Sequence, residues 1–275
     1  MEAARSAQRP RPTCQENQRY PLVGRLPISW YGAKLWYVLK IMNGVVTMNA
    51  SSLSGPAVDN PKVRVDVWSD VICPWCYIGK RRLETALSQL PDADQVQVRW
   101  HSFQLDPTYP KGVREPVREM LARKVGAAPE QVRAMTRQVT ELAAQEGLTY
   151  ALDRAIAVNT VDAHRLNQLA ARHGLDGQMH ERLLRAHLVE GAVVDDSATL
   201  VRLATEVGVD AGEADRVLAS DAYAAEVASD ARTARQLGAT GVPFFAINDR
   251  WGIAGAQPAE TFASALRTAF AAADR

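Results

Sequence analysis

Two cysteines at a short spacing are the residues of this chain best suited to chemistry. The motif Cys73-Pro74-Trp75-Cys76 follows a strand-like run and precedes a segment with the amphipathic pattern of a helix. The N–H groups at a helix N-terminus carry partial positive charge and stabilise a thiolate, which is the nucleophile of disulfide exchange. A cysteine three positions further along the same helix lies within bonding reach of the first. The spacing therefore predicts dithiol redox chemistry.

Two other interpretations of the pair stay open, a zinc half-site and a pair of inert buried thiols. A structural zinc site takes four ligands. The sequence has neither a second Cys-x-x-Cys nor a His-x-x-x-His pair to complete a tetrahedron. We therefore expect no metal, and we favour redox use of Cys73 and Cys76.

The composition is that of an ordinary globular protein. The chain has 275 residues, 47% of them hydrophobic, and a net charge of +1. Because Lys and Arg are spread among Asp and Glu, the chain offers nucleic acid no basic stripe, and no nucleic-acid partner is expected. Only three cysteines occur, and Cys14 is far from the other two, which excludes a secreted disulfide scaffold.

Residues 1–60 differ from the rest in being basic and rich in Pro, Ser, Asn and Gly. We expect them to lie outside the folded unit, either as a disordered extension or because translation begins at Met48. An apolar run within residues 20–50 suggests export or anchoring. Lys34 and Lys40 interrupt it before it reaches roughly 18 uncharged residues, so no membrane-spanning helix and no membrane partner are expected. The expected location is the cytoplasm.

The remaining pattern predicts a parallel β-α-β unit, a long helical stretch and a C-terminal hairpin with a final helix. The β-α-β unit comprises strands at 63–68 and 95–103 and a helix at 77–90. Gly and Pro punctuation divides the helical stretch, with predicted helices at 115–125, 129–146, 161–173, 177–189, 196–207, 212–219 and 221–237. The hairpin is predicted at 241–254 and the final helix at 258–272.

This order of elements, together with four sequence blocks, resembles the DsbA-like thioredoxin family and, within it, the FrnE branch of disulfide oxidoreductases. The blocks are DVICPWCYIG at 70–79, FQLDP at 103–107, NTVDAHRL at 159–166 and GATGVPFF at 238–245. The resemblance implies an α/β thioredoxin fold with a large all-helical insertion. Its parts would be residues 61–112 and 239–275 of the thioredoxin-like unit, with the helical insertion at 113–238.

The resemblance also implies roles for single residues. Cys73 would be the exposed nucleophile and Cys76 the resolving thiol, with Pro74 and Trp75 between them contacting substrate. Pro243 would follow a cis peptide bond, which is uncommon even before proline. That bond would turn the backbone of Val242 toward an extended substrate segment, which could then bind by strand addition.

Four further polar residues are candidates for a supporting role. Asp70 is a candidate cap for the helix that follows the cysteines or a proton acceptor for the resolving thiol. Asn159 and Thr160 precede a predicted helix, where Thr160 fits an N-cap and both could contact substrate or glutathione. His164 is a candidate for substrate binding, although a structural role is the simpler interpretation. Trp75 fits either an exposed docking surface or packing against the helical insertion.

Three functions are compatible with these residues. The favoured one is a thiol–disulfide oxidoreductase that acts on protein or small-molecule disulfides through a mixed disulfide, without a resident cofactor and with a thioredoxin- or glutathione-type reductant as partner. The first alternative is a glutathione-dependent isomerase or transferase of the same fold. Those relatives typically carry serine at the position of Cys73 and use glutathione as co-substrate. The second is a non-catalytic, chaperone-like binding module.

Overall fold

A parallel β-α-β unit places the cysteine pair. The structure is a computed structural model that describes residues 45–47 and 61–274. Strand β2 (Val63–Ser69) leads through a short turn into helix α2 (Pro74–Ser88), and the chain returns through a 3-10 turn (Ala93–Gln95) to strand β3 (Val96–Ser102). Strands β2 and β3 pair in parallel, in the register that sets Val65 opposite Val98. This confirms the predicted unit.

The C-terminal hairpin completes the central sheet. Strand β6 (Phe244–Ile247) pairs antiparallel with β2, and β7 (Trp251–Ala254) pairs antiparallel with β6. The turn between β6 and β7 places Asn248 and Asp249 at φ 49° and 53°, a left-handed conformation that Asn and Asp tolerate better than most residues. The hairpin prediction is thus confirmed.

A strand from the N-terminal region joins the edge of this sheet. Strand β1 (Val45–Thr47) pairs antiparallel with β7, so the order of strands is β1-β7-β6-β2-β3. The prediction that all of residues 1–60 lie outside the folded unit is therefore wrong for these three residues. Residues 1–44 and 48–60, which include Cys14, Met48 and the interrupted apolar run, lie outside the described residues. Within residues 45–47 and 61–274, no helix is long and apolar enough to cross a membrane.

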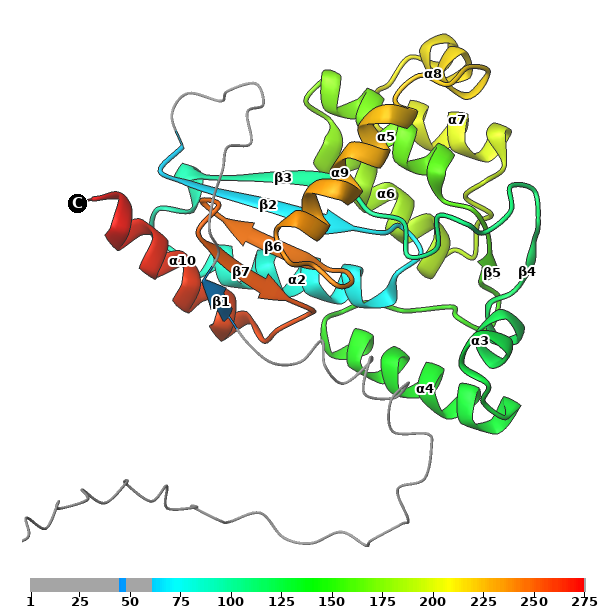
Figure 1. Cartoon of the computed structure of the whole chain (residues 1–275), viewed down its shortest axis with the longest axis horizontal. Helices are drawn as coiled ribbons and strands as arrows, with labels where there is room; N and C mark the ends of the chain where they lie inside the picture. Colours follow the sequence, from blue (N-terminus) through cyan, green and yellow to red (C-terminus); the bar gives the residue numbers. More distant parts are fainter. Residues whose placement is uncertain (1–44, 48–60, 275) are drawn as a thin grey trace, which may run out of the picture.

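Helices cover both faces of the sheet (Figure 1). Helices α2 and α10 (Ala259–Ala273) pack on one face, where Val63, Val65 and Val67 are fully buried against them. Each fully buried valine contributes about 1.5–3 kcal/mol. Helix α9 (Ala224–Gln236) covers the other face. Although α9 lies within the predicted helical insertion, it belongs by its packing to the layer over the sheet.

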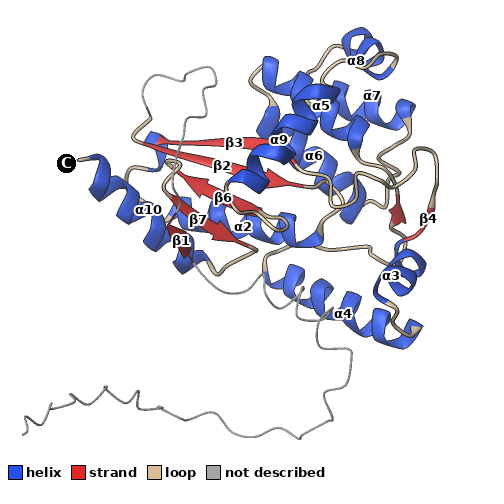
Figure 2. Cartoon of the chain, in the orientation of Figure 1, coloured by secondary structure: helices blue, strands red, loops and turns tan. Residues whose placement is uncertain are grey.

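The rest of the helical insertion forms two groups of helices (Figure 2). The helices within residues 117–145 lie against α2, and those within residues 161–218 lie beside the sheet with their own apolar core, where Leu166, Leu183 and Leu200 are fully buried. The predicted order of helices is confirmed, with ends that differ by a few residues: α3 (Val117–Val125), α4 (Pro129–Gln145), α5 (Val161–Arg172), α6 (Asp176–Leu188), α7 (Ser197–Glu206) and α8 (Ala211–Leu218).

The helical insertion is not all-helical, which corrects the prediction. Strands β4 (Glu115–Pro116) and β5 (Ile156–Ala157) pair antiparallel within it. A strand of two residues is too short to show a period-two pattern, so the sequence carries no signal for either.

A partly buried ion network fastens α9 to the sheet. His101 of β3 contacts Asp66 of β2 through Nε2 at 2.8 Å and Asp230 of α9 through Nδ1 at 3.3 Å. Its ring stacks on Trp68, whose indole N–H donates to the carbonyl of Asp230. Burial alone would lower the pKa of His101, but its hydrogen bonds and charge interactions with the two carboxylates outweigh burial and raise it to about 9. The imidazole is therefore a cation at neutral pH.

This network predicts that stability falls as the solution becomes alkaline. The folded pKa of His101 lies above its ordinary value of 6.5, so its contribution is fully present below pH 6.5 and is lost as pH rises through 9. Over that interval we expect the free energy of unfolding to fall by up to about 3 kcal/mol. Urea denaturation at a series of pH values measures this change. The variant His101→Phe should be less stable and should lack the slope; equal slopes in variant and wild type would contradict the assignment.

Helix α2 approaches the β6 strand so closely that one position in the helix has no room for a side chain. A Cβ atom added to Gly79 would lie 3.0 Å from Cγ of Pro243 and 3.2 Å from Cζ of Phe245. Separations this short force a displacement. Glycine at this position therefore sets how closely the helix that carries the cysteines lies against Pro243.

The variant Gly79→Ala should accordingly be destabilised by about 1–2 kcal/mol, despite the higher helix propensity of alanine. Gly177→Ala is the matched control, because Gly177 also lies in a helix but an added Cβ would be 3.7 Å from its nearest neighbour, an atom of Trp100. That variant should match or exceed the stability of the wild type. Chemical denaturation compares the two; a Gly79→Ala protein as stable as the control would show that the close approach is not required.

Candidate functional site

Both cysteines lie at the first turn of α2. Cys73 occupies the N-cap position and Pro74 the first helical position, where proline's fixed φ suits the helix and its missing N–H costs nothing. The N–H of Cys73 donates to the carbonyl of Asp70 at 3.0 Å, and the N–H of Cys76 donates to the carbonyl of Cys73 at 3.1 Å. Both cysteines are free thiols. The local geometry thus matches the predicted placement of a thiol pair at a helix N-terminus.

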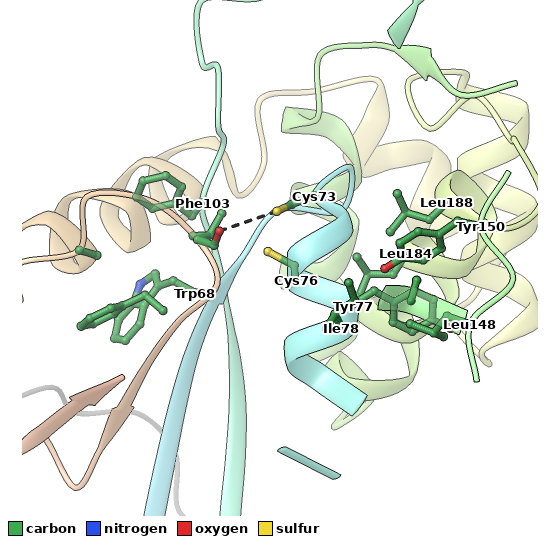
Figure 3. Packing of buried hydrophobic residues seen from close by; sticks show 14 of the residues in the cluster. Trp68, Cys73, Cys76, Tyr77, Ile78, Phe103, Leu148, Tyr150, Leu184 and Leu188 are labelled. Atoms are coloured by element: carbon green, nitrogen blue, oxygen red, sulfur yellow. Dashed lines mark hydrogen bonds between the residues drawn. The ribbon is translucent and has the colours of Figure 1, made fainter. Parts of the chain in front are cut away.

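Cys73 is not exposed, which corrects the expectation from the resemblance. It is 3% exposed, compared with 1% for Cys76. Its Sγ donates a hydrogen bond to the carbonyl oxygen of Val242 at 3.7 Å (Figure 3). In this conformation the sulfur of Cys73 is therefore covered by the segment that leads into β6.

That segment has the predicted cis peptide bond between Val242 and Pro243. The carbonyl of Pro243 accepts from the N–H of Gly255, which fastens the segment to the far end of the hairpin. The carbonyl of Val242 in this segment is the backbone acceptor that the Cys73 thiol contacts. A role for Val242 in pairing with substrate stays a prediction.

The environment of Cys76 distinguishes it from Cys73. Burial raises the pKa of the Cys76 thiol well above its ordinary value, and the contact with Cys73 raises it further. The nearby Ser69 hydroxyl and Asp70 backbone oppose this only in part. Cys76 therefore keeps its proton at neutral pH, as suits a thiol that reacts second.

Asp70 does not cap α2, so the favoured interpretation of this residue is wrong. Its side chain is fully buried and points away from the helix, accepting from the N–H of Leu105 at 2.7 Å and contacting Nε2 of His164 at 3.2 Å. The carboxylate therefore ties the turn before Cys73 to the loop after β3 and to α5.

His164 lies behind the cysteine turn among other buried imidazoles of the helical insertion. It is 1% exposed and contacts Asp70. Burial lowers the pKa of His187 to about 4, even though the charge of Asp70 and a backbone hydrogen bond at Ala192 act in the opposite direction. The pKa of His180 is lowered by burial and by the neighbouring His164 and Lys80. Among the described residues, no three His, Cys, Asp or Glu side chains are grouped to hold a metal ion.

Asn159 and Thr160 precede α5, and it is Asn159 whose side chain bonds to the start of the helix. Thr160 occupies the predicted N-cap position, but its side chain makes no capping hydrogen bond. Oδ1 of Asn159 instead accepts from the N–H of Val161 at 2.9 Å and from the amide of Gln104 at 3.2 Å. Asn159 also donates to the carbonyl of Tyr109. Asn159 therefore fixes the loop after β3 against the start of α5.

Pro74 and Trp75 are the first two residues of α2, and both are half-buried. Trp75 is half-buried and packs against the apolar cluster that contains Leu148, Tyr150 and Leu184. Packing against this cluster therefore accounts for the buried part of the Trp75 side chain. Figure 3 shows Leu148, Tyr150 and Leu184 on one side of the start of α2, and Trp68 with Phe103, which belong to the same cluster, on the other side.

Tyr150 is a residue of the site that sequence reasoning missed. Its hydroxyl donates to the carbonyl of Pro74 at 2.6 Å. Burial raises the pKa of Tyr150, and the nearby Cys73 and Cys76 raise it further, so the hydroxyl stays protonated. Tyr150 lies in a loop remote from the motif in sequence. Its only signal is the alternation of Leu148, Tyr150 and Leu152, which indicates burial but not contact with the cysteine turn.

A thiol pair at a helix start can exchange disulfides, and known proteins are similar to this chain in sequence and fold. A family model described as a DSBA-like thioredoxin domain matches residues 64–267. The crystal structure of a probable DsbA oxidoreductase from Streptomyces coelicolor is 44% identical, with a TM-score of 0.74 over 76% of this chain and 90% of that one.

Two more distant structures share the fold. They are a 2-hydroxychromene-2-carboxylate isomerase, 16% identical with a TM-score of 0.55, and the cytosolic disulfide reductase DsbM from Pseudomonas aeruginosa, 22% identical with a TM-score of 0.50. The similarity covers 76% of this chain and 94% of the isomerase, and 74% of this chain and 97% of DsbM. Because the family model spans well over half of the sequence, the chain belongs to the DSBA-like thioredoxin domain family.

Proposed function

We propose that this protein is a thiol–disulfide oxidoreductase in which Cys73 is the nucleophile and Cys76 the resolving thiol. The observation that carries the proposal is the placement of both free thiols in the first turn of α2, with Sγ of Cys73 against the segment before cis-Pro243. The environment of Cys76 fits the role of resolving thiol, because burial keeps this thiol protonated until it reacts.

The proposed reaction is a pair of thiol–disulfide exchanges. The Cys73 thiolate attacks one sulfur of the substrate disulfide, forms a mixed disulfide and releases the other substrate sulfur as a thiolate, which takes up a proton. Cys76 then loses its proton and attacks Cys73 Sγ, which releases the second substrate thiol. The substrate gains two electrons, and the protein is left with a Cys73–Cys76 disulfide. A thioredoxin- or glutathione-type reductant would restore the dithiol, and the reverse sequence would oxidise a substrate.

Substrate access requires Cys73 to leave the Val242 carbonyl. An extended peptide that pairs with the Val242 backbone would compete for the same acceptor, so binding and uncovering of the sulfur would occur together. This arrangement suits protein disulfides as well as small ones such as oxidised glutathione. We place the reaction in the cytoplasm, where the thiol pool would hold the pair largely reduced.

The presence of both thiols favours this proposal over a glutathione-dependent isomerase or transferase. Relatives with those activities typically use serine at the position of Cys73 to hold the thiolate of glutathione. Here Cys73 can supply a thiolate itself, and Cys76 lies three residues further along, in the first turn of the same helix. A chaperone-like binding module needs neither thiol, so it gives no account of their placement.

Replacing Cys73 by serine should reduce the rate of insulin disulfide reduction by more than about 100-fold, because the variant lacks the nucleophile. Turbidity of the precipitating insulin B chain measures this rate. Cys14→Ser is the matched control and should retain full activity. Wild-type protein that leaves insulin unreduced but accelerates a glutathione-dependent isomerisation would favour the first alternative. Suppression of aggregation that survives loss of Cys73 and Cys76 would favour the second.

Replacing Cys76 by serine should instead trap the intermediate, because no second thiol in the turn can resolve it. We expect a mixed disulfide between Cys73 and glutathione to accumulate when the variant is mixed with oxidised glutathione. Peptide mass spectrometry locates the adduct. An adduct on Cys14 alone, with Cys73 unmodified, would contradict the assigned order of attack.

A further inference from the structure

A hydrogen bond from the helical insertion reaches the peptide backbone of the cysteine turn. Tyr150, in the loop between α4 and β5, donates its hydroxyl proton to the carbonyl of Pro74 at 2.6 Å. The tyrosine is 7% exposed and its ring stacks on Tyr77 at a centroid distance of 6.3 Å. The next residue, Ala151, donates its N–H to the carbonyl of Leu188 at 2.7 Å, which fixes the loop on α6. The hydroxyl is therefore held in place from two sides.

The hydrogen bond reaches the peptide unit that faces Cys73. The carbonyl of Pro74 and the N–H of Trp75 belong to the same peptide group, and Trp75 is the second residue of a helix whose N-cap is Cys73. An N-cap side chain accepts hydrogen bonds from the N–H groups of the second or third helical residue. The structure gives the Trp75 N–H no acceptor among the residues it describes. That N–H is therefore free to bond to Cys73 Sγ when the sulfur becomes a thiolate.

A donor at one end of a peptide group strengthens the donor at its other end, because hydrogen bonds in a chain polarise one another. We propose that Tyr150 is a positioning residue that fixes the Pro74–Trp75 peptide and strengthens the Trp75 N–H as a donor to the Cys73 thiolate. The hydroxyl acts through the backbone and does not bond to the sulfur. This inference assigns the helical insertion a part in tuning the cysteine pair, and it rests on the proposed function.

The surroundings of Tyr150 suit this role. Burial keeps its hydroxyl protonated. The ionisable groups that act on it are Cys73, Cys76, Tyr77 and Arg81, all of which lie in α2 or cap it. Tyr77 makes comparable bonds elsewhere, since its hydroxyl contacts Glu181 at 2.5 Å and Arg81 at 3.0 Å. Of these two neighbouring tyrosines, only Tyr150 donates its hydroxyl proton to the carbonyl of Pro74.

The test is the rate of alkylation of Cys73 by iodoacetamide as a function of pH, assigned by peptide mass spectrometry so that Cys14 and Cys76 are counted separately. The variant Tyr150→Phe keeps the ring and removes the donor. At neutral pH its Cys73 should react about three- to fivefold more slowly, and its rate should converge with the wild type at alkaline pH, where the thiolate is fully formed. Tyr77→Phe is the matched control and should follow the wild-type profile.

A second readout is the equilibrium of the reduced protein with glutathione, in which two glutathione molecules reduce the Cys73–Cys76 disulfide and leave as one glutathione disulfide. Because Tyr150→Phe destabilises the thiolate form, its equilibrium should shift toward the protein disulfide by a similar factor at alkaline pH, where the reduced protein is mostly thiolate. An unchanged alkylation profile in Tyr150→Phe would overturn the inference. Equal slowing at every pH, or equal slowing in Tyr77→Phe, would also overturn it, since either would indicate a change of access or packing.

Alkylation needs no disulfide substrate, so the two proposals fail separately. If the wild type reduces no disulfide while Tyr150→Phe still shifts the alkylation profile, the proposed function is wrong and the positioning role stands. If the wild type reduces insulin and the profile does not move, the positioning role is wrong alone.

Discussion

The close approach of α2 to the segment that leads into β6 is the constraint on which the rest of the structure depends. Gly79 allows the helix to lie against Pro243, and Cys73 at the helix start then meets the Val242 carbonyl. A side chain at position 79 would separate the two elements, and the sulfur would lose its contact. The placement of the cysteine turn is thus set by a packing distance at the next turn of the same helix, and its chemistry follows from that distance.

The sheet and the helical insertion meet at this turn. One apolar cluster contains Trp68 and Phe244 from the sheet, both cysteines, and Tyr150 with Leu184 from the helical insertion. Polar contacts fasten the same junction, since Asp70 binds the loop after β3 and contacts His164 of α5. The cysteine turn is therefore held by both parts of the protein, and a change in how they pack would alter the environment of the thiols.

Much of the fold follows from local patterns, and the cysteine pair follows from its spacing. The parallel β-α-β unit, the hairpin and most helices show hydrophobic periodicity with clear Gly and Pro ends. Strands β1, β4 and β5 were missed because two or three residues cannot show a period. The packing of α9 on the sheet is fastened by the charges of His101, Asp66 and Asp230, which sequence position alone does not connect.

The site residues missed or misassigned are those whose contacts cross between distant segments. Asp70 resembles a helix cap by its position, yet its carboxylate is drawn to the backbone N–H of Leu105 and to His164. Thr160 has the side chain of an N-cap, but Asn159 makes the bond. Tyr150 lacks any motif, and its relevance lies in one bond to Pro74. Each case is decided by tertiary contact, which local propensity does not determine.

The proposed function requires Cys73 and Cys76 to form a reversible disulfide. The most direct measurement equilibrates the protein in glutathione buffers of graded redox poise and quantifies the Cys73–Cys76 disulfide by mass spectrometry. We predict a single two-electron transition with a midpoint within the range of known thioredoxin-fold proteins, about −270 to −120 mV. If no Cys73–Cys76 disulfide forms at any poise in that range, or if the disulfide cannot be reduced again, the two thiols are not a redox-active pair and the proposed function is wrong.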